Sequence, residues 1–386
     1  MSHIRSNNPG SSSIVSVPVT RPCLPPLEDV IPYLHEIWTS GQVTNDGAYA
    51  RRLQEALEVY LEVPNVSLVT NCTLGIFLAL RALGITGEVI TSPYTFVAPV
   101  NAIALAGATP VFADIDPVTF NLSPKAVAEQ ITERTQAILA VHSYGIPCEV
   151  EELQAIADRR GIPLIYDAAH CFGVKVGGRS LLDYGTCSIV SFHATKVFNT
   201  IEGGAVVSSD PQLNQAIRRL ANNGIVDEVT VDSIGLNAKM SELRAAIGLA
   251  QLPYVSGRIS KRRMIVETYL EALSDTRGLR FVQPPPNVAH NGYMFPIILE
   301  AEYPVTRDSL YDTLRRNGIS SRRYFYPLVT DFPPYSNAPS AGPGSLAVAR
   351  RAAASVLCLP LFPNLDPADQ KRIIEIVRNP TMPNLE

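Results

Sequence analysis

The sequence predicts an α/β fold: a large, mostly parallel sheet of seven strands with helices on both faces, followed by a smaller C-terminal α+β domain. Two observations carry this prediction. Short apolar runs recur between residues 67 and 209, and amphipathic stretches lie between most of them, which is typical of parallel strands buried on both faces. After Pro211 the pattern turns helical and leaves the sheet. With 386 residues, the chain is long enough for two domains.

The predicted elements of the large domain alternate along the chain. Apolar runs rich in β-branched residues predict seven strands, at residues 67–71, 88–92, 110–114, 137–142, 163–168, 187–192 and 204–209. Amphipathic stretches predict four helices between them, at residues 73–83, 97–106, 124–131 and 149–160. Because a helix can return the chain to the starting edge of the sheet, this alternation favours parallel strand pairs.

The C-terminal part combines helices with few strands. Two helices, 240–252 and 262–273, are expected to carry the chain away from the sheet, and the stretch Gln283-Pro-Pro-Pro286 suggests a boundary. The elements predicted beyond it are a strand at 293–299, an extended segment at 320–326, a Pro/Ser/Gly-rich loop at 333–345, and helices at 307–316, 346–354 and 367–378. The expected division is a mobile N-terminal segment (1–20), a large domain (21–252) and a small domain (253–386).

Composition and charge argue against several classes of protein. The net charge is −4 and no block of Lys or Arg stands out, so we expect neither nucleic acid nor an anionic membrane as a partner. No apolar run reaches about 18 residues, and the N-terminus lacks the pattern of a secretory signal. The six cysteines are scattered without a C-x-x-C pair, and no H-E-x-x-H motif or Cys/His cluster is present. We therefore expect a cytoplasmic protein without a metal site.

Two charged residues at predicted strand ends suggest the chemistry of pyridoxal 5'-phosphate (PLP). Lys196 closes the run Ser191-Phe-His-Ala-Thr-Lys196 on the loop between two apolar strands, and Asp167 ends the strand before them. A lone lysine is usually a solvated surface residue, but ligands of α/β proteins bind at the carboxyl ends of parallel strands. A lysine there can attach PLP through its aldehyde, and an aspartate can keep the pyridine nitrogen protonated, so that the ring accepts electrons.

Lys196 is expected to transfer protons as well as to bind the cofactor, and Asp167 needs a partner for its charge. Once the amino-acid substrate has displaced it, Lys196 would move a proton between the substrate Cα and the C4′ atom of the cofactor. This role needs a neutral amine, so we expect its pKa to lie below the free value. A carboxylate that ends an apolar strand, as Asp167 does, is unfavourable without a cation or a hydrogen-bond donor, and a protonated pyridine is such a partner.

Other residues near predicted strand ends fit the same site, although each also has an ordinary structural explanation. The phosphate is expected near Thr70-Asn-Cys-Thr73, where a strand ends and a helix begins with free N–H groups, but on this segment alone Thr73 is more often a helix N-cap. Phe96 could stack on the pyridine ring or be a core residue. Ser191 could donate a hydrogen bond to the phosphate, or it could be a polar strand-end residue that is hydrogen-bonded within the protein. His170 could reach the cofactor or be a hydrogen-bonded core histidine.

Three motifs stand in order along the chain. They are Ser-Phe-His-x-x-Lys at 191–196, the following Glu202-Gly-Gly204, and Gly235-Leu-Asn-Ala-Lys-Met-Ser-Glu-Leu-Arg-Ala-Ala-Ile-Gly248. Taken together, these motifs resemble the DegT family of PLP-dependent nucleotide-sugar aminotransferases. The resemblance runs from about Leu24 to Leu361, nearly the whole chain. It implies a fold-type-I PLP enzyme that acts as a homodimer with active sites at the subunit interface.

Further stretches are most similar to one branch of that family. They are Leu24-Pro-Pro-Leu27, Thr44-Asn-Asp-Gly47, His193-Ala-Thr-Lys-Val-Phe-Asn-Thr200 and Tyr324-Phe-Tyr-Pro-Leu328. The branch aminates C4 of a dTDP-linked 4-keto-6-deoxy sugar. The resemblance therefore implies that L-glutamate gives its amino group to the 4-keto carbon of such a nucleotide sugar and leaves as 2-oxoglutarate.

The resemblance also implies roles for individual residues. Lys196 would carry PLP, Asp167 would pair with the pyridine nitrogen, and Phe96 would stack on the ring. The phosphate would be bound by Cys72, Thr73, Ser191 and, from the neighbouring subunit, Asn237. Candidates for contacts with the sugar substrate are Lys239, Tyr324 and Tyr326.

Two departures from the family pattern concern the substrate. Val329 stands where many members carry a histidine that faces the sugar, and Trp38-Thr-Ser-Gly-Gln-Val-Thr44 differs from the usual Trp-Leu-Thr pattern. Because a related dehydratase branch has histidine in place of the active lysine, Lys196 argues for amino transfer. The identity of the nucleotide and the position of the keto group stay open.

Other functions stay open as well. A 3-keto sugar aminotransferase of the same family is one, and a β-lyase or desulfurase of the same fold type is another. An oxidoreductase is disfavoured, because no G-x-G-x-x-G motif follows an early strand. A protein that retains PLP without turnover is disfavoured by the presence of both Lys196 and Asp167.

Overall fold

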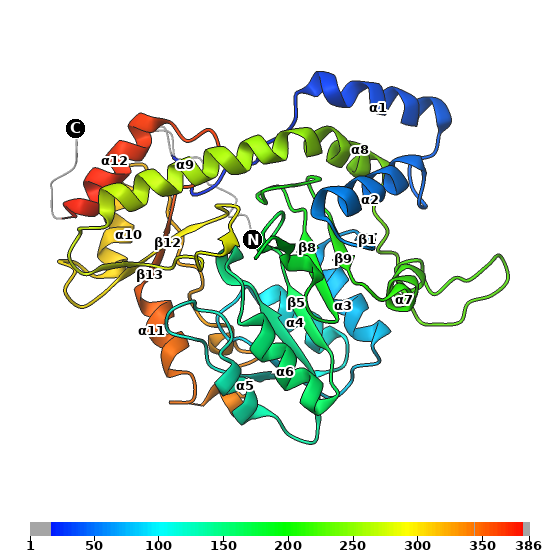
Figure 1. The fold of residues 1–386 in the computed structure, drawn as a ribbon, viewed down its shortest axis with the longest axis horizontal. Coiled ribbons are helices and arrows are strands. Elements are labelled where there is room, and N and C mark those ends of the chain that lie inside the picture. The colour runs from blue at the N-terminus through cyan, green and yellow to red at the C-terminus, as the bar shows by residue number, and fades with distance from the viewer. Residues whose placement is uncertain (1–16, 343, 381–386) are drawn as a thin grey trace.

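The computed structural model describes residues 17–342 and 344–380. Of the segment predicted to be mobile, residues 1–16 lie outside the described residues. The residues that come next in the sequence lie against the C-terminal unit. Val17 forms a parallel bridge with Ile319, and the Leu361 N–H donates to the Val19 carbonyl at 2.9 Å. Figure 1 shows a large unit built on a central sheet beside a smaller unit, with the long helix α9 (Val255–Leu273) leading from one to the other. The predicted limits at residues 21, 252 and 253 stay a prediction.

The large unit contains all seven predicted strands in one sheet. In spatial order they are β1 (Val66–Val69), β9 (Gly204–Val207), β8 (Cys187–Ser191), β5 (Leu164–Asp167), β4 (Thr135–Val141), β2 (Glu88–Thr91) and β3 (Thr109–Phe112). Only β9 runs antiparallel, to both of its neighbours in the sheet, and the other pairs are parallel. The prediction of a mostly parallel α/β sheet is therefore confirmed.

Helices cover both faces of this sheet, as predicted. Successive residues of a strand point to opposite faces, so Ile90 and Ile138 lie in one core cluster while Val89 and Leu139 lie in the other. The first cluster is covered by α2 (Ala48–Leu61), α5 (Pro124–Gln130), α6 (Val150–Arg160) and α8 (Glu242–Gln251). The second is covered by α3 (Cys72–Ala82), α4 (Val97–Leu105) and α7 (Pro211–Ala221).

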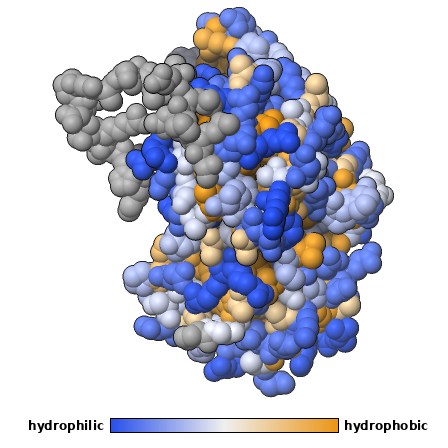
Figure 2. Space-filling model, turned by 90° about the vertical axis from the view of Figure 1, so that its left-hand side faces the viewer, coloured by the Kyte–Doolittle hydropathy of each residue, from blue (hydrophilic) through white to orange (hydrophobic). Residues whose placement is uncertain are grey.

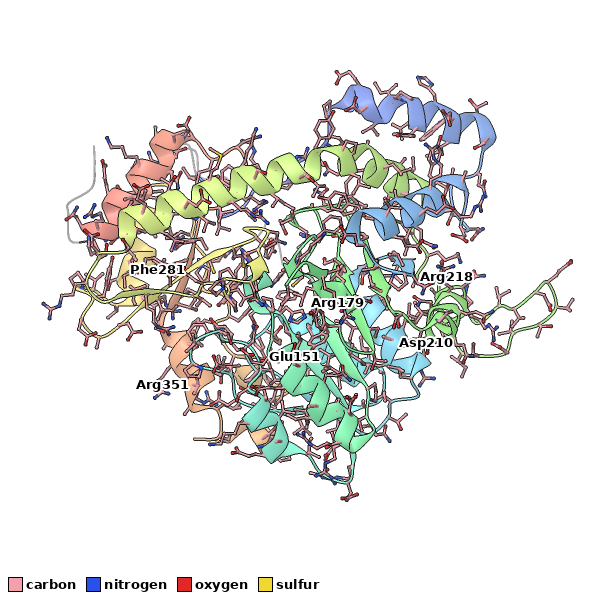
Figure 3. The ribbon with its side chains drawn as sticks, in the orientation of Figure 1. Glu151, Arg179, Asp210, Arg218, Phe281 and Arg351 are labelled. Atoms are coloured by element: carbon pink, nitrogen blue, oxygen red, sulfur yellow. The ribbon has the colours of Figure 1, made fainter. Side chains whose placement is uncertain are left out.

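Local capping explains where several of these helices begin. The Asp210 side chain accepts the Gln212 N–H at 2.8 Å, and Pro211 occupies the first helical position of α7, where no N–H is needed. Farther along the helix, Arg218 donates to the Val66 carbonyl at 3.0 Å and ties α7 to the edge strand β1 (Figure 3). At α3 the N-cap is Asn71, whose side chain accepts the Leu74 N–H at 2.9 Å. The alternative that Thr73 is an N-cap was therefore wrong.

Several elements were not predicted from the sequence. Before the first predicted strand lie α1 (Leu27–Ser40), which packs on α8 at the top of Figure 1, and α2. After β5, the short strands β6 (Lys175–Val176) and β7 (Arg179–Ser180) form a small sheet with β11 (Val288–Ala289). Because β11 comes from far along the chain, its pairing with β6 brings residues near 290 back to the large unit.

The small unit is an antiparallel sheet flanked by helices. Its strands, in spatial order, are β10 (Leu279–Phe281), β12 (Phe295–Leu299) and β13 (Val356–Leu359). Its helices are α9, α10 (Arg307–Arg316), α11 (Ala347–Ser355) and α12 (Pro367–Arg378). The stretch Gln283-Pro-Pro-Pro286 follows β10 and precedes β11, so it lies where the chain leaves the small sheet for the large unit.

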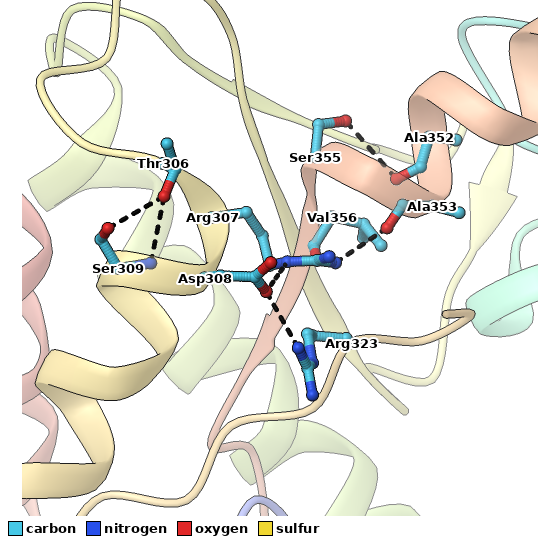
Figure 4. A network of polar contacts seen from close by, with 9 residues as sticks. All are labelled: Thr306, Arg307, Asp308, Ser309, Arg323, Ala352, Ala353, Ser355 and Val356. Atoms are coloured by element: carbon cyan, nitrogen blue, oxygen red, sulfur yellow. Dashed lines mark hydrogen bonds and ion pairs between the residues drawn. The ribbon is translucent and has the colours of Figure 1, made fainter. Parts of the chain in front are cut away.

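A buried arginine holds the segment at residues 320–326 against the small unit. Arg307, 4% exposed, donates to the carbonyls of Ala353 at 2.8 Å and Val356 at 3.3 Å (Figure 4). Asp308 accepts hydrogen bonds from Arg307 at 2.7 Å and from Arg323 at 2.9 Å. Since Arg323 belongs to the segment that leads into Tyr324 and Phe325, this network positions the aromatic residues that face the large unit.

Figure 2 shows that hydrophilic side chains cover most of the face on the side of the small unit, with hydrophobic ones in small groups. Among the described residues no helix is long and apolar enough to cross a membrane. Within the same residues, no group of three or more His, Cys, Asp or Glu side chains could hold a metal ion. All six cysteines are free thiols.

Candidate active site

A cavity of about 290 Å³ lies between the two units, at the carboxyl ends of β4, β5 and β8 and at the beginnings of α3 and α4. The predicted site residues that line it are Cys72, Thr73, Phe96, Asp167, His170, Ser191, Lys196 and Tyr324. They come from five separate stretches of the sequence. The parallel arrangement brings four of these stretches together, because the loops that follow parallel strands meet at one edge of the sheet. Tyr324 comes from the small unit.

Lys196 reaches into this cavity from the loop that follows β8. Its N–H donates to the His193 carbonyl at 2.9 Å, which folds the loop into a turn. Its amine nitrogen Nζ lies 3.1 Å from the Tyr293 hydroxyl oxygen and 4.8 Å from the centre of the Tyr293 ring. Among the described residues, the tyrosine hydroxyl is the only hydrogen-bond partner of this amine.

The pKa of Lys196 differs from the expectation. Burial lowers it, but the neighbouring Tyr293, Asp167 and Cys72 favour the charged amine and raise it. Because these contributions exceed the effect of burial, the pKa of Lys196 lies above its ordinary value. The predicted lowering of the pKa does not hold for the cofactor-free protein, because its acidic and phenolic neighbours outweigh burial.

Asp167 is a buried carboxylate without a cationic partner. It ends β5, is 6% exposed, and accepts the Ala169 N–H at 2.9 Å and the weak thiol donor of Cys72 at 3.9 Å. No ion pair among the described residues includes it. Burial raises its pKa, while the Ala169 N–H, Lys196 and Cys72 oppose the rise. An incompletely paired buried carboxylate that faces a cavity is a site for a cationic or protonated ligand group.

The beginning of α3 offers a site for an anion on the same wall. Asn71 uses its side chain to cap Leu74, and within the described residues no acceptor is recorded for the N–H groups of Cys72 and Thr73. These N–H groups and the helix dipole favour a phosphate. Gly204 packs close beneath, since a Cβ atom at this position would lie 2.8 Å from the Cys72 nitrogen.

His170 forms part of the cavity wall as a neutral ring. It is 9% exposed, its ring stacks on Tyr293 with the ring centres 4.6 Å apart, and its Nδ1 atom has no hydrogen-bond partner among the described residues. Burial, together with Lys196 and His142, lowers its pKa well below the ordinary value. The unpartnered nitrogen can therefore bond to a group that enters the cavity.

The sequence profile of one protein family, described as the DegT/DnrJ/EryC1/StrS aminotransferase family, matches residues 27–378. The chain belongs to this aminotransferase family. The resemblance found in the motifs is thereby confirmed, as is the prediction that the chain is a transaminase.

Individual relatives of this aminotransferase cover nearly its whole length. It is 44% identical over 354 residues to a protein of Escherichia coli named dTDP-4-amino-4,6-dideoxy-D-glucose transaminase, with 91% of this chain and 95% of that protein covered. It is 42% identical over 360 residues to a Shigella dysenteriae protein of the same name, with 93% and 98% covered. The crystal structure of DesI in the presence of its TDP-sugar product matches with a TM-score of 0.90 and 35% identity, over 95% of this chain and 93% of that one.

The aminotransferase does not bring every predicted site residue to the cavity. Tyr326 is 47% exposed and lies beside Arg307 and Arg323, whose guanidinium carbons are 4.7 and 5.2 Å from the ring centre. Asn237 is exposed and forms a backbone bridge with Asn222. The Asn222 side chain accepts a hydrogen bond from Lys239 at 2.6 Å, and Lys239 lines a different cavity of about 650 Å³.

Phe96 lines the cavity of the aminotransferase but is not a core residue. Its side chain is 61% exposed, and it occupies the N-cap position of α4. Ser191, by contrast, is buried at the end of β8 and accepts the His193 N–H at 3.4 Å. An exposed phenylalanine at a cavity rim is available to cover a ligand ring.

The small unit contributes more residues to the site than Tyr324, which was the one of its cavity-lining residues that the sequence predicted. Tyr293, Met294 and Phe325 line the cavity, and none was predicted as a site residue. Tyr293 was placed at the start of a strand, whereas β12 begins only at Phe295. No quoted motif contains Tyr293 or Met294, because their position depends on the pairing of β11 with β6 and on the packing between the two units. Phe325 lies inside the quoted stretch 324–328 but was not singled out as a site residue. From the large unit, Thr95, His193 and Glu202 also line the cavity and were missed.

Proposed function

We propose that this aminotransferase uses PLP to move the amino group of L-glutamate to the 4-keto carbon of a dTDP-linked 4-keto-6-deoxy sugar. The observation that carries the proposal is the position of Lys196 and Asp167 in one buried cavity, on the loop and strand where their motif predicts them. The names of the Escherichia coli and Shigella dysenteriae relatives support the choice of substrate. The TDP-sugar in the DesI structure supports the nucleotide.

The residues of the cavity fit PLP. The buried carboxylate of Asp167, which lacks a cation, would hold the protonated pyridine nitrogen. The phosphate would be held by the N–H groups of Cys72 and Thr73 at the start of α3, with Ser191 near it. His170 would offer its unpartnered nitrogen, and Phe96 would cover the ring from the rim. Bound PLP supplies an electrophilic aldehyde and a protonated ring that withdraws electrons from the substrate.

The protein contributes orientation and proton transfer. Lys196 would hold the cofactor and, when its amine is free, take a proton from the Cα atom of glutamate and return one to the sugar carbon that receives the amine. The same amine would serve both half-reactions, because the second half-reaction reverses the proton transfer of the first. Closure of the cavity by Tyr324 and Phe325 would keep water from the reacting atoms.

A second cavity offers room for the nucleotide part of the substrate. It has a volume of about 920 Å³ and shares Tyr293, Met294 and Tyr324 with the first. Arg315 and Arg322 line it, and neither forms an ion pair among the described residues. Unpaired guanidinium groups favour a diphosphate, so we propose that the nucleotide diphosphate extends from the first cavity into the second.

The test is product analysis with defined substrates. Purified protein supplied with PLP, L-glutamate and dTDP-4-keto-6-deoxyglucose should form 2-oxoglutarate and an amino sugar in equal amounts, with the amine at C4 by NMR. The 3-keto isomer serves as the matched control and should react poorly. Preference for the 3-keto isomer would replace the proposed regiochemistry, and release of pyruvate and sulfide from cysteine without sugar amination would favour a lyase.

We further propose a homodimer with shared active sites. The connection between α7 and α8 extends away from the rest of the chain in Figure 1, and it carries Val229 at 91% and Ile234 at 86% exposure. Aliphatic side chains on a projecting segment favour burial against another surface. A second copy would cover them and would bring its own Asn237, at the base of this segment, to the neighbouring phosphate site.

Mixing two inactive variants tests the shared site. Neither Lys196→Ala nor Asn237→Ala alone should be active at low PLP. After subunit exchange, each heterodimer should contain one site with both changes and one with neither, so an equal mixture should recover about one quarter of the wild-type activity. Mass spectrometry of the intact dimers verifies the exchange. Proven exchange without recovery would contradict the role of Asn237 across the interface.

A further inference from the structure

A tyrosine of the small unit touches the amine of Lys196. The two residues are 97 positions apart in the sequence, and the Tyr293 hydroxyl oxygen lies 3.1 Å from the Lys196 Nζ atom. Tyr293 is 6% exposed, and Lys196 is the only hydrogen-bond partner of its hydroxyl group among the described residues. A buried tyrosine hydroxyl normally has a partner, and here that partner is the residue expected to move protons.

Asn291 fixes both the backbone and the ring of this tyrosine. Its side-chain oxygen accepts the Tyr293 N–H at 3.0 Å, while its amide nitrogen donates to the carbonyls of His170 at 2.8 Å and Phe172 at 3.1 Å. One buried side chain therefore ties Tyr293 to the loop that carries His170. The stack between the His170 and Tyr293 rings, inclined by 28°, sets the direction of the hydroxyl group.

Arg262 supports the same segment from the opposite side. Its side chain is 2% exposed and donates to the Leu361 carbonyl at 3.2 Å and to the Tyr293 carbonyl at 3.5 Å. Gly292 has a φ of +64°, and a Cβ atom there would lie 2.9 Å from the Arg262 Cβ. The turn before Tyr293 is thus packed directly on α9, so the position of the hydroxyl group is built into the fold.

We propose that Tyr293 is a catalytic residue whose hydroxyl group holds the free amine of Lys196 and remains its hydrogen-bond partner in both protonation states. The tyrosine oxygen can accept a hydrogen bond from an N–H of the ammonium group and also from an N–H of the neutral amine. While one N–H of Lys196 donates to Tyr293, the nitrogen lone pair is free to face the carbon and take its proton. When the ammonium group gives a proton back to carbon, the N–H that donates to the tyrosine oxygen stays in place. The proposal rests on the proton-transfer role of Lys196 in the proposed function.

The pKa of Lys196 agrees with this contact. Burial alone lowers the pKa, and among the groups that oppose burial Tyr293 makes the largest contribution. Removal of the hydroxyl group should therefore lower the pKa of the amine. At a fixed pH below the pKa, a lower pKa means a larger neutral fraction, by about tenfold for one unit, and a faster reaction with an acylating reagent.

The experiment is carried out on the cofactor-free protein, so that it does not depend on turnover. Trace acetic anhydride labels the amines of the wild type and of Tyr293→Phe across a pH series, and peptide mass spectrometry resolves Lys196 from the other five lysines. In Tyr293→Phe, the midpoint of Lys196 labelling should shift to lower pH. Tyr324→Phe removes another hydroxyl group of the same cavity, which is not bonded to Lys196, and should leave the midpoint unchanged.

Two labelling results would overturn the proposal. An unchanged midpoint in Tyr293→Phe would overturn the proposal. Faster labelling at every pH with the same midpoint would show only easier access to the cavity and would overturn it too.

In the PLP-loaded enzyme, Tyr293→Phe should lower kcat by about 10- to 100-fold with little change in KM for glutamate, as expected for a hydrogen bond to a charged group. If the proposed amino transfer itself fails, the labelling of the cofactor-free protein still decides whether Tyr293 acts on Lys196.

Discussion

Replacement of Lys196 by alanine is expected to lower kcat by about 10³-fold or more, because both attachment of the cofactor and proton transfer depend on this amine. The fold should persist, because Asp167, whose pKa is already raised by burial, can take up a proton when the nearby charge of Lys196 is removed. Stopped-flow measurement of 2-oxoglutarate formation gives the rate. The absorbance spectrum provides a second readout, because the visible band of lysine-attached PLP should be lost while free PLP can still bind.

Lys371→Ala is the matched control, since this lysine lies on the exposed face of α12, far along the chain from the cavity. It should have wild-type kcat and spectrum. Activity of Lys196→Ala near that of the control would contradict the assignment of the base. Lost activity with an unfolded protein, measured by circular dichroism, would instead contradict the expectation that Lys196 is dispensable for folding.

Replacement of Asp167 by asparagine is expected to have opposite effects on the cofactor-free and the PLP-loaded protein. Burial raises the pKa of Asp167, so the folded state binds a proton more readily than the unfolded state. The carboxylate therefore lowers folding stability as pH rises through the folded-state pKa, and asparagine removes this penalty. Cofactor-free Asp167→Asn should unfold at the same temperature as the wild type or above it at neutral pH.

With PLP the order should reverse. Removing one partner of a buried ion pair typically destabilises a protein by about 3–5 kcal/mol. PLP should therefore stabilise Asp167→Asn far less than the wild type. We also expect kcat to fall by about 10²-fold or more. Asp183→Asn makes the same chemical change at a residue paired with Arg179 outside the cavity, and PLP should stabilise it as much as the wild type. Equal stabilisation of Asp167→Asn and the control by PLP would contradict the ion pair with the pyridine nitrogen.

Much of the large unit could be predicted because its signals are local. The strands of a parallel sheet are buried on both faces, so they are visible as short apolar runs, and all seven overlap the observed strands. Helix α7 begins at Pro211, where a capping aspartate and a proline stand side by side in the sequence. The helices α1 and α2 were missed, since neither lies between two apolar runs.

The site could be predicted in part for the same reason. Lys196, Asp167 and the segment at Thr73 each follow a strand, and parallel strands bring their carboxyl ends to one edge. Tyr293 has no such signal, because it precedes β12. It reaches the cavity only because the pairing of β11 with β6 brings this part of the chain back to the large unit. For the cofactor-free protein, the pKa of Lys196 was predicted in the wrong direction, since its sign depends on which groups lie within a few ångströms.

The sequence by itself determined the sheet, the family and the pair Lys196 and Asp167, because periodic burial and short motifs are properties of neighbouring residues. The tertiary structure decided which residues complete the site. Contacts between a loop after β8 and a turn before β12 depend on how two units pack, and packing follows from the fit of many side chains together. For this reason Tyr293 came to lie on Lys196, whereas Tyr326, two residues after the cavity-lining Tyr324, lies outside the cavity.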